Sequence, residues 1–183
     1  MHCYGAKDIA AAFRTVRKNT IIIAEEIDES KYNFQPAKDT RTVAQLLVHI
    51  AVIPRVQHQV HGVEKRTTLG GFDFPTFIGR LIDEEKKPRT KAEIVTLLKE
   101  SGEEFAGWVE TLSDDFLAER MAMPPGMHPD FKTRFEMLLG TKEHEMHHRA
   151  QLMLIERLIG IVPHLTREFQ ARVAAMQSAS AKP

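Results

Sequence analysis

Hydrophobic residues recur along most of the chain at the three- and four-residue spacing of an α-helix, and strand-like alternation is scarce. Four long segments carry such an apolar stripe, and the pattern predicts helices over residues 6–29, 42–61, 91–111 and 133–159. Shorter helical patterns cover residues 74–85 and 165–176. Four long amphipathic helices in one chain predict an all-α fold built as a helical bundle.

The starts of three long helices can be read from capping residues. A Thr followed three residues later by Gln or Glu allows the two side chains to satisfy two unpaired backbone amides. Such pairs are Thr42 with Gln45, Thr90 with Glu93, and Thr133 with Glu136. Each pair precedes an apolar-periodic run, so we place the starts of the second, third and fourth long helices there.

Pro54 interrupts the second long helix. It lacks the amide that would donate to the carbonyl of Ile50, and its ring clashes with the preceding turn. We therefore expect a kink in this helix just past His49.

Two long connections separate the bundle helices. Residues 62–88 form a connection whose length is unusual unless it has structure of its own or covers something. Residues 113–132 are rich in Met and Pro, and we interpret them as an irregular connection in preference to the mouth of a pocket. Since the chain shows no repeat or domain boundary, we predict one four-helix-bundle domain over residues 1–177 and a disordered tail over residues 178–183.

Composition and charge narrow the class of partner. Lys plus Arg equals Asp plus Glu at 25 each, so no net charge attracts the chain to nucleic acid or to an anionic membrane. No segment reaches the roughly 20 continuous apolar residues of a membrane-spanning helix, and the N-terminus lacks the pattern of a secretory signal. The single cysteine, Cys3, excludes an intramolecular disulfide. We therefore expect a cytoplasmic protein without a nucleic-acid or membrane partner.

The densest chemistry in the sequence is the run of His144, His147 and His148. At about 100° per residue, His144 and His148 lie roughly 40° apart and one turn apart on a helix, so both imidazoles can reach one ion. His147 is an alternative partner for His144. The face that carries His144 and His148 continues into apolar residues, which favours the pair with His148. Glu145 lies about 100° round the helix from His144, so this run does not supply the general base of a His-Glu-x-x-His zinc protease.

His49 is the best candidate for a third ligand, because it lies among apolar residues on the second long helix, where an unpartnered ring is costly to bury. Antiparallel packing of the second and fourth helices, at about 1.5 Å per residue, places His49 level with His144 and His148. His58 lies about half a turn round from His49 and is expected to face solvent. The other histidines lie near a helix end, in loops or at a terminus: His2, His61, His128 and His164. The alternative to a metal site is a core role for His49 and a solvated histidine stripe on the fourth helix.

The segment RTVAQLLVHIA, the run TKEHEMHHRAQLMLIERLIGIVP and the spacing between them resemble the DinB/YfiT-like family of metal-binding proteins, which is related to bacterial thiol-dependent S-transferases. The resemblance covers residues 6–163. It implies an up-down-down-up four-helix bundle with extra short helices, a homodimer, and a metal site formed by His49, His144 and His148. Ala150 stands where family members often have Gly, and Pro54 is a further departure from the family pattern.

The resemblance also implies a function. Three neutral imidazoles suit Zn²⁺, Ni²⁺ or Fe²⁺, and three protein ligands leave a coordination position for a small-molecule substrate. The expected activity is that of a metal-dependent thiol S-transferase-like enzyme, in which the metal lowers the pKa of a low-molecular-weight thiol. One alternative is a metal-dependent hydrolase, although the sequence offers no convincing general base. Another is a non-catalytic metal-binding stress-response protein, because no catalytic group can be named beyond the ligands.

Overall fold

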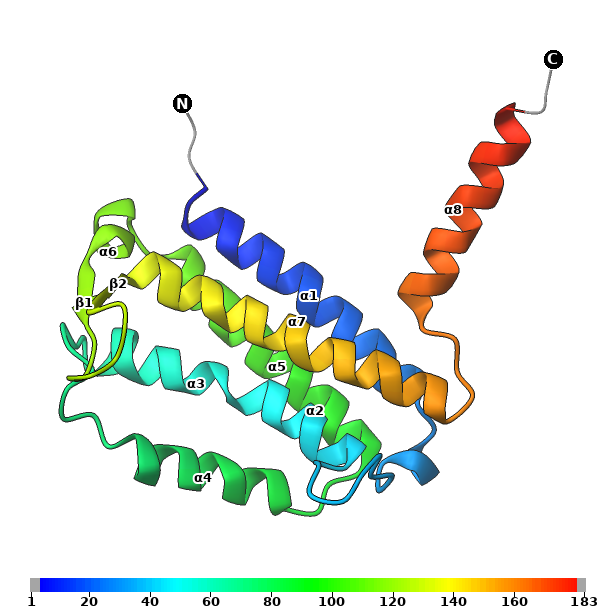
Figure 1. Ribbon diagram of the computed structural model, residues 1–183, viewed down its shortest axis with the longest axis horizontal. Helices are drawn as coiled ribbons and strands as arrows, with labels where there is room; N and C mark the ends of the chain where they lie inside the picture. The colour runs from blue at the N-terminus through cyan, green and yellow to red at the C-terminus, as the bar shows by residue number, and fades with distance from the viewer. Residues whose placement is uncertain (1–3, 181–183) are drawn as a thin grey trace.

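The computed structural model describes residues 4–180 and shows a four-helix bundle (Figure 1). The bundle helices are α1 (Ala6–Glu26), α2 (Val43–Val52) continued by α3 (Pro54–Gln57), α5 (Lys91–Glu110) and α7 (Arg134–Leu158). In Figure 1, α1 and α7 run in one direction, whereas α2 with α3 and α5 run in the other. The predicted all-α fold and the up-down-down-up order are therefore confirmed.

The predicted capping residues begin three of these helices. The hydroxyl of Thr42 accepts the amide of Gln45 at 3.2 Å, which starts α2. Thr90 and Thr133 accept the amides of Glu93 and Glu136 in the same way at the starts of α5 and α7. In return, the side chains of Gln45, Glu93 and Glu136 each accept the backbone amide of the capping Thr. Two otherwise unpaired amides are thus satisfied at each helix start.

Helix α4 (Phe74–Lys86) occupies the first long connection and packs along α2 on the outside of the bundle. It carries the chain back to the end of the bundle where α2 begins, so that α5 starts there and runs parallel to α2 (Figure 1). The length of the connection is thus explained by a helix of its own, which runs back along α2. The buried face of α4 includes Leu81 and Glu85.

The break in the second helix is found where Pro54 predicts it. Helix α2 ends at Val52, α3 begins at Pro54, and a π-helical turn, η2 (His58–Val63), follows. The carbonyl of Ile50, which has no amide to bond at residue 54, accepts Nη2 of Arg17 at 3.1 Å. The kink is confirmed, and the freed carbonyl is satisfied by a side chain from α1.

The connection from residue 113 to residue 132 is more regular than expected. It contains α6 (Asp114–Ala118) and two short antiparallel strands, β1 (Arg120–Ala122) and β2 (Phe131–Thr133), in which Met121 pairs with Lys132. Met121 is fully buried, and the Arg120 guanidinium lies over the Phe131 ring at 4.4 Å. The expectation of an irregular segment is corrected: strands of three residues are too short to show an alternating pattern.

Two short elements complete the described chain. A single 3₁₀ turn, η1 (Glu29–Lys31), follows α1, and α8 (His164–Ser180) extends away from the bundle (Figure 1). Of the predicted tail, residues 178–180 lie in α8 and residues 181–183 lie outside the described residues. His2 and Cys3 also lie outside the described residues. Among residues 4–180, no helix has the length and apolar character needed to cross a membrane.

The bundle core is divided by a buried polar layer. One hydrophobic cluster gathers around α2 and includes Ile23, whereas another lies toward the opposite end of α1 and includes Phe13. Between them, Arg17 donates from Nε to Glu145 Oε1 at 2.9 Å and from Nη1 to the carbonyl of Leu98 at 2.7 Å. A Cβ atom on Gly102 would lie 2.8 Å from Cγ of Arg17, so a glycine is needed to admit this side chain.

Candidate metal centre

The structure brings the three predicted ligand residues together. His49 projects from α2, and His144 and His148 project from adjacent turns of α7. The Nε2 atom of His144 lies 3.3 Å from Nε2 of His49 and 3.2 Å from Nε2 of His148. Donor atoms of all three residues lie within 4.8 Å of one another.

These separations fit a small divalent cation. Nitrogen atoms placed tetrahedrally at about 2.0–2.1 Å from zinc lie roughly 3.3–3.4 Å apart. The two separations that involve His144 match this spacing. The three side chains could therefore hold one divalent metal without a large movement.

The outer hydrogen bonds of two rings decide where their protons lie. Nδ1 of His49 is 2.8 Å from Oε1 of Glu85, and a carboxylate can only accept, so Nδ1 carries the proton and Nε2 has a free lone pair. Nδ1 of His148 likewise donates to Oε1 of Gln151 at 2.8 Å. Two lone pairs therefore point at His144, whose Nε2 can donate to only one of them. A cation satisfies this arrangement better than a third imidazole does.

Glu85 is a functional residue that the sequence interpretation missed. It is the only buried acidic side chain on α4 among the described residues, and it also accepts Nε of Arg41 at 2.6 Å. Burial raises the pKa of Glu85, but the bonds from His49 and Arg41 outweigh burial and hold its pKa below the usual value. The carboxylate is thus charged and fixes the His49 ring. Glu85 lies four residues after Leu81, on the same face of a helix that the sequence predicts. This spacing could have indicated that Glu85 is buried.

Two histidines of the centre, His144 and His148, are neutral near pH 7. The pKa of His144 is lowered to about 4, chiefly by burial and also by the neighbouring His148 and His49. Burial also lowers the pKa of His148. Because only a neutral imidazole can bind a metal through its lone pair, these rings are ready to act as ligands at neutral pH.

The remaining histidines lie elsewhere. His147 is exposed, lies outside the cluster and contacts Gln151 through Nε2 at 3.2 Å. His58 was expected to face solvent, but it is half-buried and packs edge-on against Trp108 of α5, with ring centroids 4.9 Å apart.

Two histidines that were assigned to a helix end and a loop are buried. His61 lies in the π-helical turn and bonds Arg134, and His164 begins α8 and lies 3.2 Å from Asn19. The turn and α8 pack these rings inward, which spacing alone could not reveal. His128 is exposed in the loop between the strands, as expected.

Glu145 is unavailable to the centre, although it follows His144 directly. Its carboxylate is 1% exposed, faces α1 and accepts bonds from Arg17 and from the hydroxyl of Thr20 at 2.8 Å. The expectation that Glu145 is not the base of a zinc-protease motif agrees with this position.

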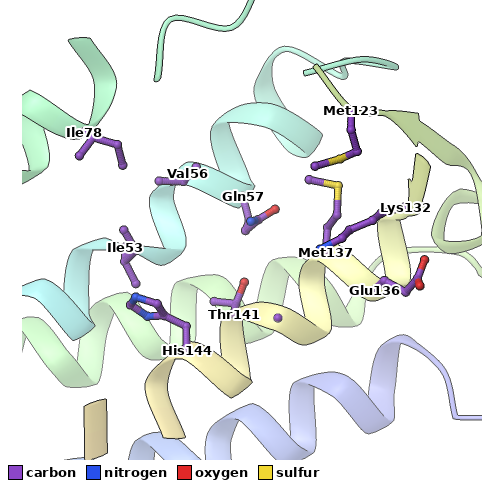
Figure 2. A pocket seen from close by; sticks show the side chains of 11 residues that line it. Ile53, Val56, Gln57, Ile78, Met123, Lys132, Glu136, Met137, Thr141 and His144 are labelled. Carbon is purple, nitrogen blue, oxygen red and sulfur yellow. The ribbon is translucent and has the colours of Figure 1, made fainter. Parts of the chain in front are cut away.

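Two cavities adjoin the histidines from different sides. The first, of about 360 Å³, includes His144 in its wall and lies between α3, α4 and α7 (Figure 2). The second, of about 790 Å³, includes His148 and Glu85 in its wall. Met123 and Lys132 contribute to the first cavity, which corrects the interpretation of residues 113–132 as a connection alone.

Comparison with known proteins places the chain in a family. The family model of the DinB superfamily matches residues 12–152. The chain belongs to the DinB superfamily. The resemblance read from the two histidine segments is thereby confirmed. No curated protein matches the chain.

Solved structures share the DinB fold of this chain at low sequence identity. YfiT from Bacillus subtilis, described as a probable metal-dependent hydrolase with an unusual four-helix bundle topology, is 16% identical with a TM-score of 0.66, over 88% of this chain and 91% of its own. A DinB-like protein from Bacillus subtilis is 22% identical with a TM-score of 0.58, over 83% and 92%. An uncharacterised protein from Clostridium difficile 630 is 13% identical with a TM-score of 0.64, over 87% and 99%. At these identities the structures support the fold alone.

Proposed function

We propose that this DinB protein is a metal-dependent thiol S-transferase-like enzyme in which His49, His144 and His148 ligate one divalent transition metal, Zn²⁺, Ni²⁺ or Fe²⁺. The observation that carries the proposal is the meeting of three Nε2 atoms between two cavities. A bound divalent cation lowers the pKa of a coordinated thiol or water, which makes either a nucleophile near neutral pH.

The two cavities support a reaction with two substrates. One adjoins His144 and the other adjoins His148, so two molecules can approach the centre from different sides. We assign the thiol to the larger cavity, whose wall carries two basic and two acidic side chains, Arg41 and Lys86 with Asp39 and Glu85, and therefore selects no net charge. The smaller cavity would then take the electrophile. A cavity that reaches His144 also favours an open site over a sealed structural one.

Metal-dependent hydrolysis is the second candidate, because YfiT is described as a probable metal-dependent hydrolase. Hydrolysis needs a base that can activate water. Within residues 4–180, the buried carboxylates nearest the histidines in sequence or space are both engaged: Glu145 by Arg17, and Glu85 by His49 and Arg41. This engagement ranks hydrolysis below thiol transfer.

The first experiment tests the metal centre. Protein purified without a histidine tag is loaded with Zn²⁺, Ni²⁺ or anaerobic Fe²⁺, and bound metal is measured by elemental analysis. We expect one ion per chain, lost in His49→Ala and in His148→Ala. His58→Ala is the matched control and should keep its metal, since His58 packs against Trp108 away from the centre. Equal metal in all four proteins would contradict the proposed ligands.

The second experiment tests the reaction. Metal-loaded protein is assayed with a panel of low-molecular-weight thiols and electrophilic carbonyl compounds, and in parallel with esters and amides. Turnover that requires the thiol, and that is lost on chelation and in His148→Ala, is the expected result. Hydrolysis of an ester or amide without a thiol would favour the second candidate. Stoichiometric metal with no turnover in either panel would favour the non-catalytic alternative.

A further inference from the structure

A relay of hydrogen bonds fixes the orientation of Gln57 at the smaller cavity. Nη1 of Arg134 lies 2.8 Å from Nδ1 of His61, and a guanidinium can only donate, so Nδ1 of His61 is the acceptor. Neutral His61 then carries its proton on Nε2, which lies 3.0 Å from Oε1 of Gln57. The amide oxygen of Gln57 is therefore engaged. Its Nε2 group has no hydrogen-bond partner within residues 4–180.

The anchor of this relay is buried. Arg134 is 2% exposed and is held by Glu119, whose carboxylate accepts Nε at 2.8 Å. The pKa of His61 is lowered to about 4, chiefly by burial and also by the charge of Arg134, so the ring stays neutral. Because Arg134 cannot lose its proton, no other arrangement of donors satisfies the relay, and the Gln57 side chain is turned with its NH₂ group free.

Thr141 supplies a second unpartnered polar group to the same cavity. It lies on α7, three residues before His144, and it is 6% exposed. Its hydroxyl is buried and has no hydrogen-bond partner in the described chain. Figure 2 shows Gln57 and Thr141 on opposite sides of the cavity, with His144 beside Thr141. A buried hydroxyl without a partner costs roughly 1–3 kcal/mol, so a ligand that completes its bond is favoured.

The rest of the wall is mainly apolar. Ile53, Ile78 and Met137 line it, and the charged residues at its edge are one Lys and one Glu, Lys132 and Glu136. A net charge on the ligand is therefore not selected here. The cavity combines an apolar surface with two hydrogen-bond donors near His144.

We infer that this cavity binds the electrophile through its carbonyl group, with the carbonyl oxygen accepting from Gln57 Nε2 and Thr141 Oγ1 and an uncharged apolar body against Ile53, Ile78 and Met137. The inference rests on the proposed function, because it assigns this cavity to one of the two substrates. Gln57 and Thr141 are thus specificity-determining residues for a carbonyl compound. Neither residue contributes to metal binding.

The test uses the full chain labelled with ¹⁵N, with N,N-dimethylhexanamide as the probe, because this amide offers a carbonyl acceptor and no N–H donor. We expect the side-chain NH₂ signals of Gln57, assigned by their absence in Gln57→Glu, to shift on titration. Thr141→Val and Gln57→Glu should each weaken binding roughly five- to tenfold, the effect of one hydrogen bond. Gln57→Glu keeps an oxygen for His61 and replaces the donor with a charged acceptor, so Thr141→Val, which adds no charge, is the cleaner of the two variants. Thr141→Ser, and Thr96→Val on the exposed face of α5, should bind within about twofold of the parent.

The titration is run on zinc-loaded and on metal-free protein. Unmoved Gln57 signals at saturating probe in both forms, or equal binding by parent and Thr141→Val, would overturn the inference. Failure to load any of Zn²⁺, Ni²⁺ and anaerobic Fe²⁺, with the Gln57 shift retained in the metal-free protein, would overturn the proposed function and leave the carbonyl site intact. The parent titration does not depend on the folding of any variant.

Discussion

Two polar clusters lie on opposite sides of α7, and they begin at neighbouring residues. Glu145 faces α1 and belongs to a closed network, in which the guanidinium of Arg17 bonds a carboxylate and the carbonyls of Leu98 and Ile50. His144 faces α2 and belongs to an incomplete cluster, in which the lone pairs of His49 and His148 share at most one donor, Nε2 of His144. Buried polar groups in folded proteins nearly always find partners. The network is therefore a structural device, whereas the histidine cluster calls for a ligand from outside the chain.

Breaking the closed network around Arg17 and Glu145 should have the largest effect on the stability of the protein. Arg17→Met removes the guanidinium donors of the network and leaves the Glu145 carboxylate buried with one remaining side-chain bond, from Thr20. Stranding a buried charge costs about 3–5 kcal/mol, which for a chain of this size lowers the melting temperature by roughly 10 °C. The double variant Arg17→Met with Glu145→Leu should recover most of the loss, since no charge is then stranded. Thermal unfolding of metal-free protein measures both, and a loss below about 1 kcal/mol in the single variant would refute the structural role.

A third buried group on α7 sharpens the comparison, because it has neither a partner nor a ligand site. Glu156 is fully buried, and neither carboxylate oxygen has a hydrogen-bond partner in the described chain. Its pKa is raised from 4.5 to about 7, chiefly by burial and also by the charge of Glu26. The folded state thus prefers neutral Glu156. The stability that this preference supplies is present below about pH 4.5 and is lost as the pH rises through about 7.

Glu156→Gln should therefore raise the free energy of unfolding by roughly 2–3 kcal/mol at pH 8 and leave it almost unchanged at pH 4.5. Urea unfolding at the two pH values measures the difference. Glu143→Gln, at an exposed position of the same helix, is the control and should show no such pH dependence. Equal effects of Glu156→Gln at both pH values would show that the carboxyl is not held neutral.

Glu85 on α4 supports His49, so changing Glu85 tests the histidine cluster. Glu85→Ala removes the acceptor that fixes the proton and the ring of His49. Loss of such a partner weakens metal binding by about 10- to 100-fold. Competition with a chromogenic chelator measures the affinity, and Asp83→Ala, at a neighbouring exposed position of α4, is the control. Zinc affinity in Glu85→Ala equal to that of the control would mean that His49 needs no support.

The smallest effect is expected at His147, which the sequence alone offered as a rival ligand. His147 is exposed and lies outside the cluster that His148 completes. His147→Ala should change zinc affinity by less than about twofold. His147 is not one of the proposed ligands and does not orient any of them, so its contribution to metal binding is small. The same chelator assay measures it, with His148→Ala as the contrasting variant. A larger loss in His147→Ala than in His148→Ala would reverse the choice between the two rings.

The bundle could be predicted because its signals are local. The capping residues, the apolar stripes and Pro54 each act within a few residues of their own position, and the structure has helices where they predict them. The meeting of three histidines also followed from local rules, through a four-residue spacing on one helix and an apolar setting on another. Glu85 and Gln57 escaped prediction because their roles depend on docking. Glu85 reaches His49 only when α4 packs on α2, and Gln57 is oriented by His61, whose own proton is placed by the distant Arg134.

Pro54 has a consequence beyond the bend that it imposes. A proline in a helix usually leaves a carbonyl without a donor, yet here the carbonyl of Ile50 receives one from Arg17, so the interruption leaves no backbone acceptor empty. An engineer who straightened this helix with Pro54→Ala would introduce a competing amide at the same oxygen. Arg17, Pro54 and Gly102 thus form one structural unit around the carbonyl of Ile50. Exchanging any one of these three residues alone disturbs the fit of the others, whereas grafting them together would carry the bend to another bundle.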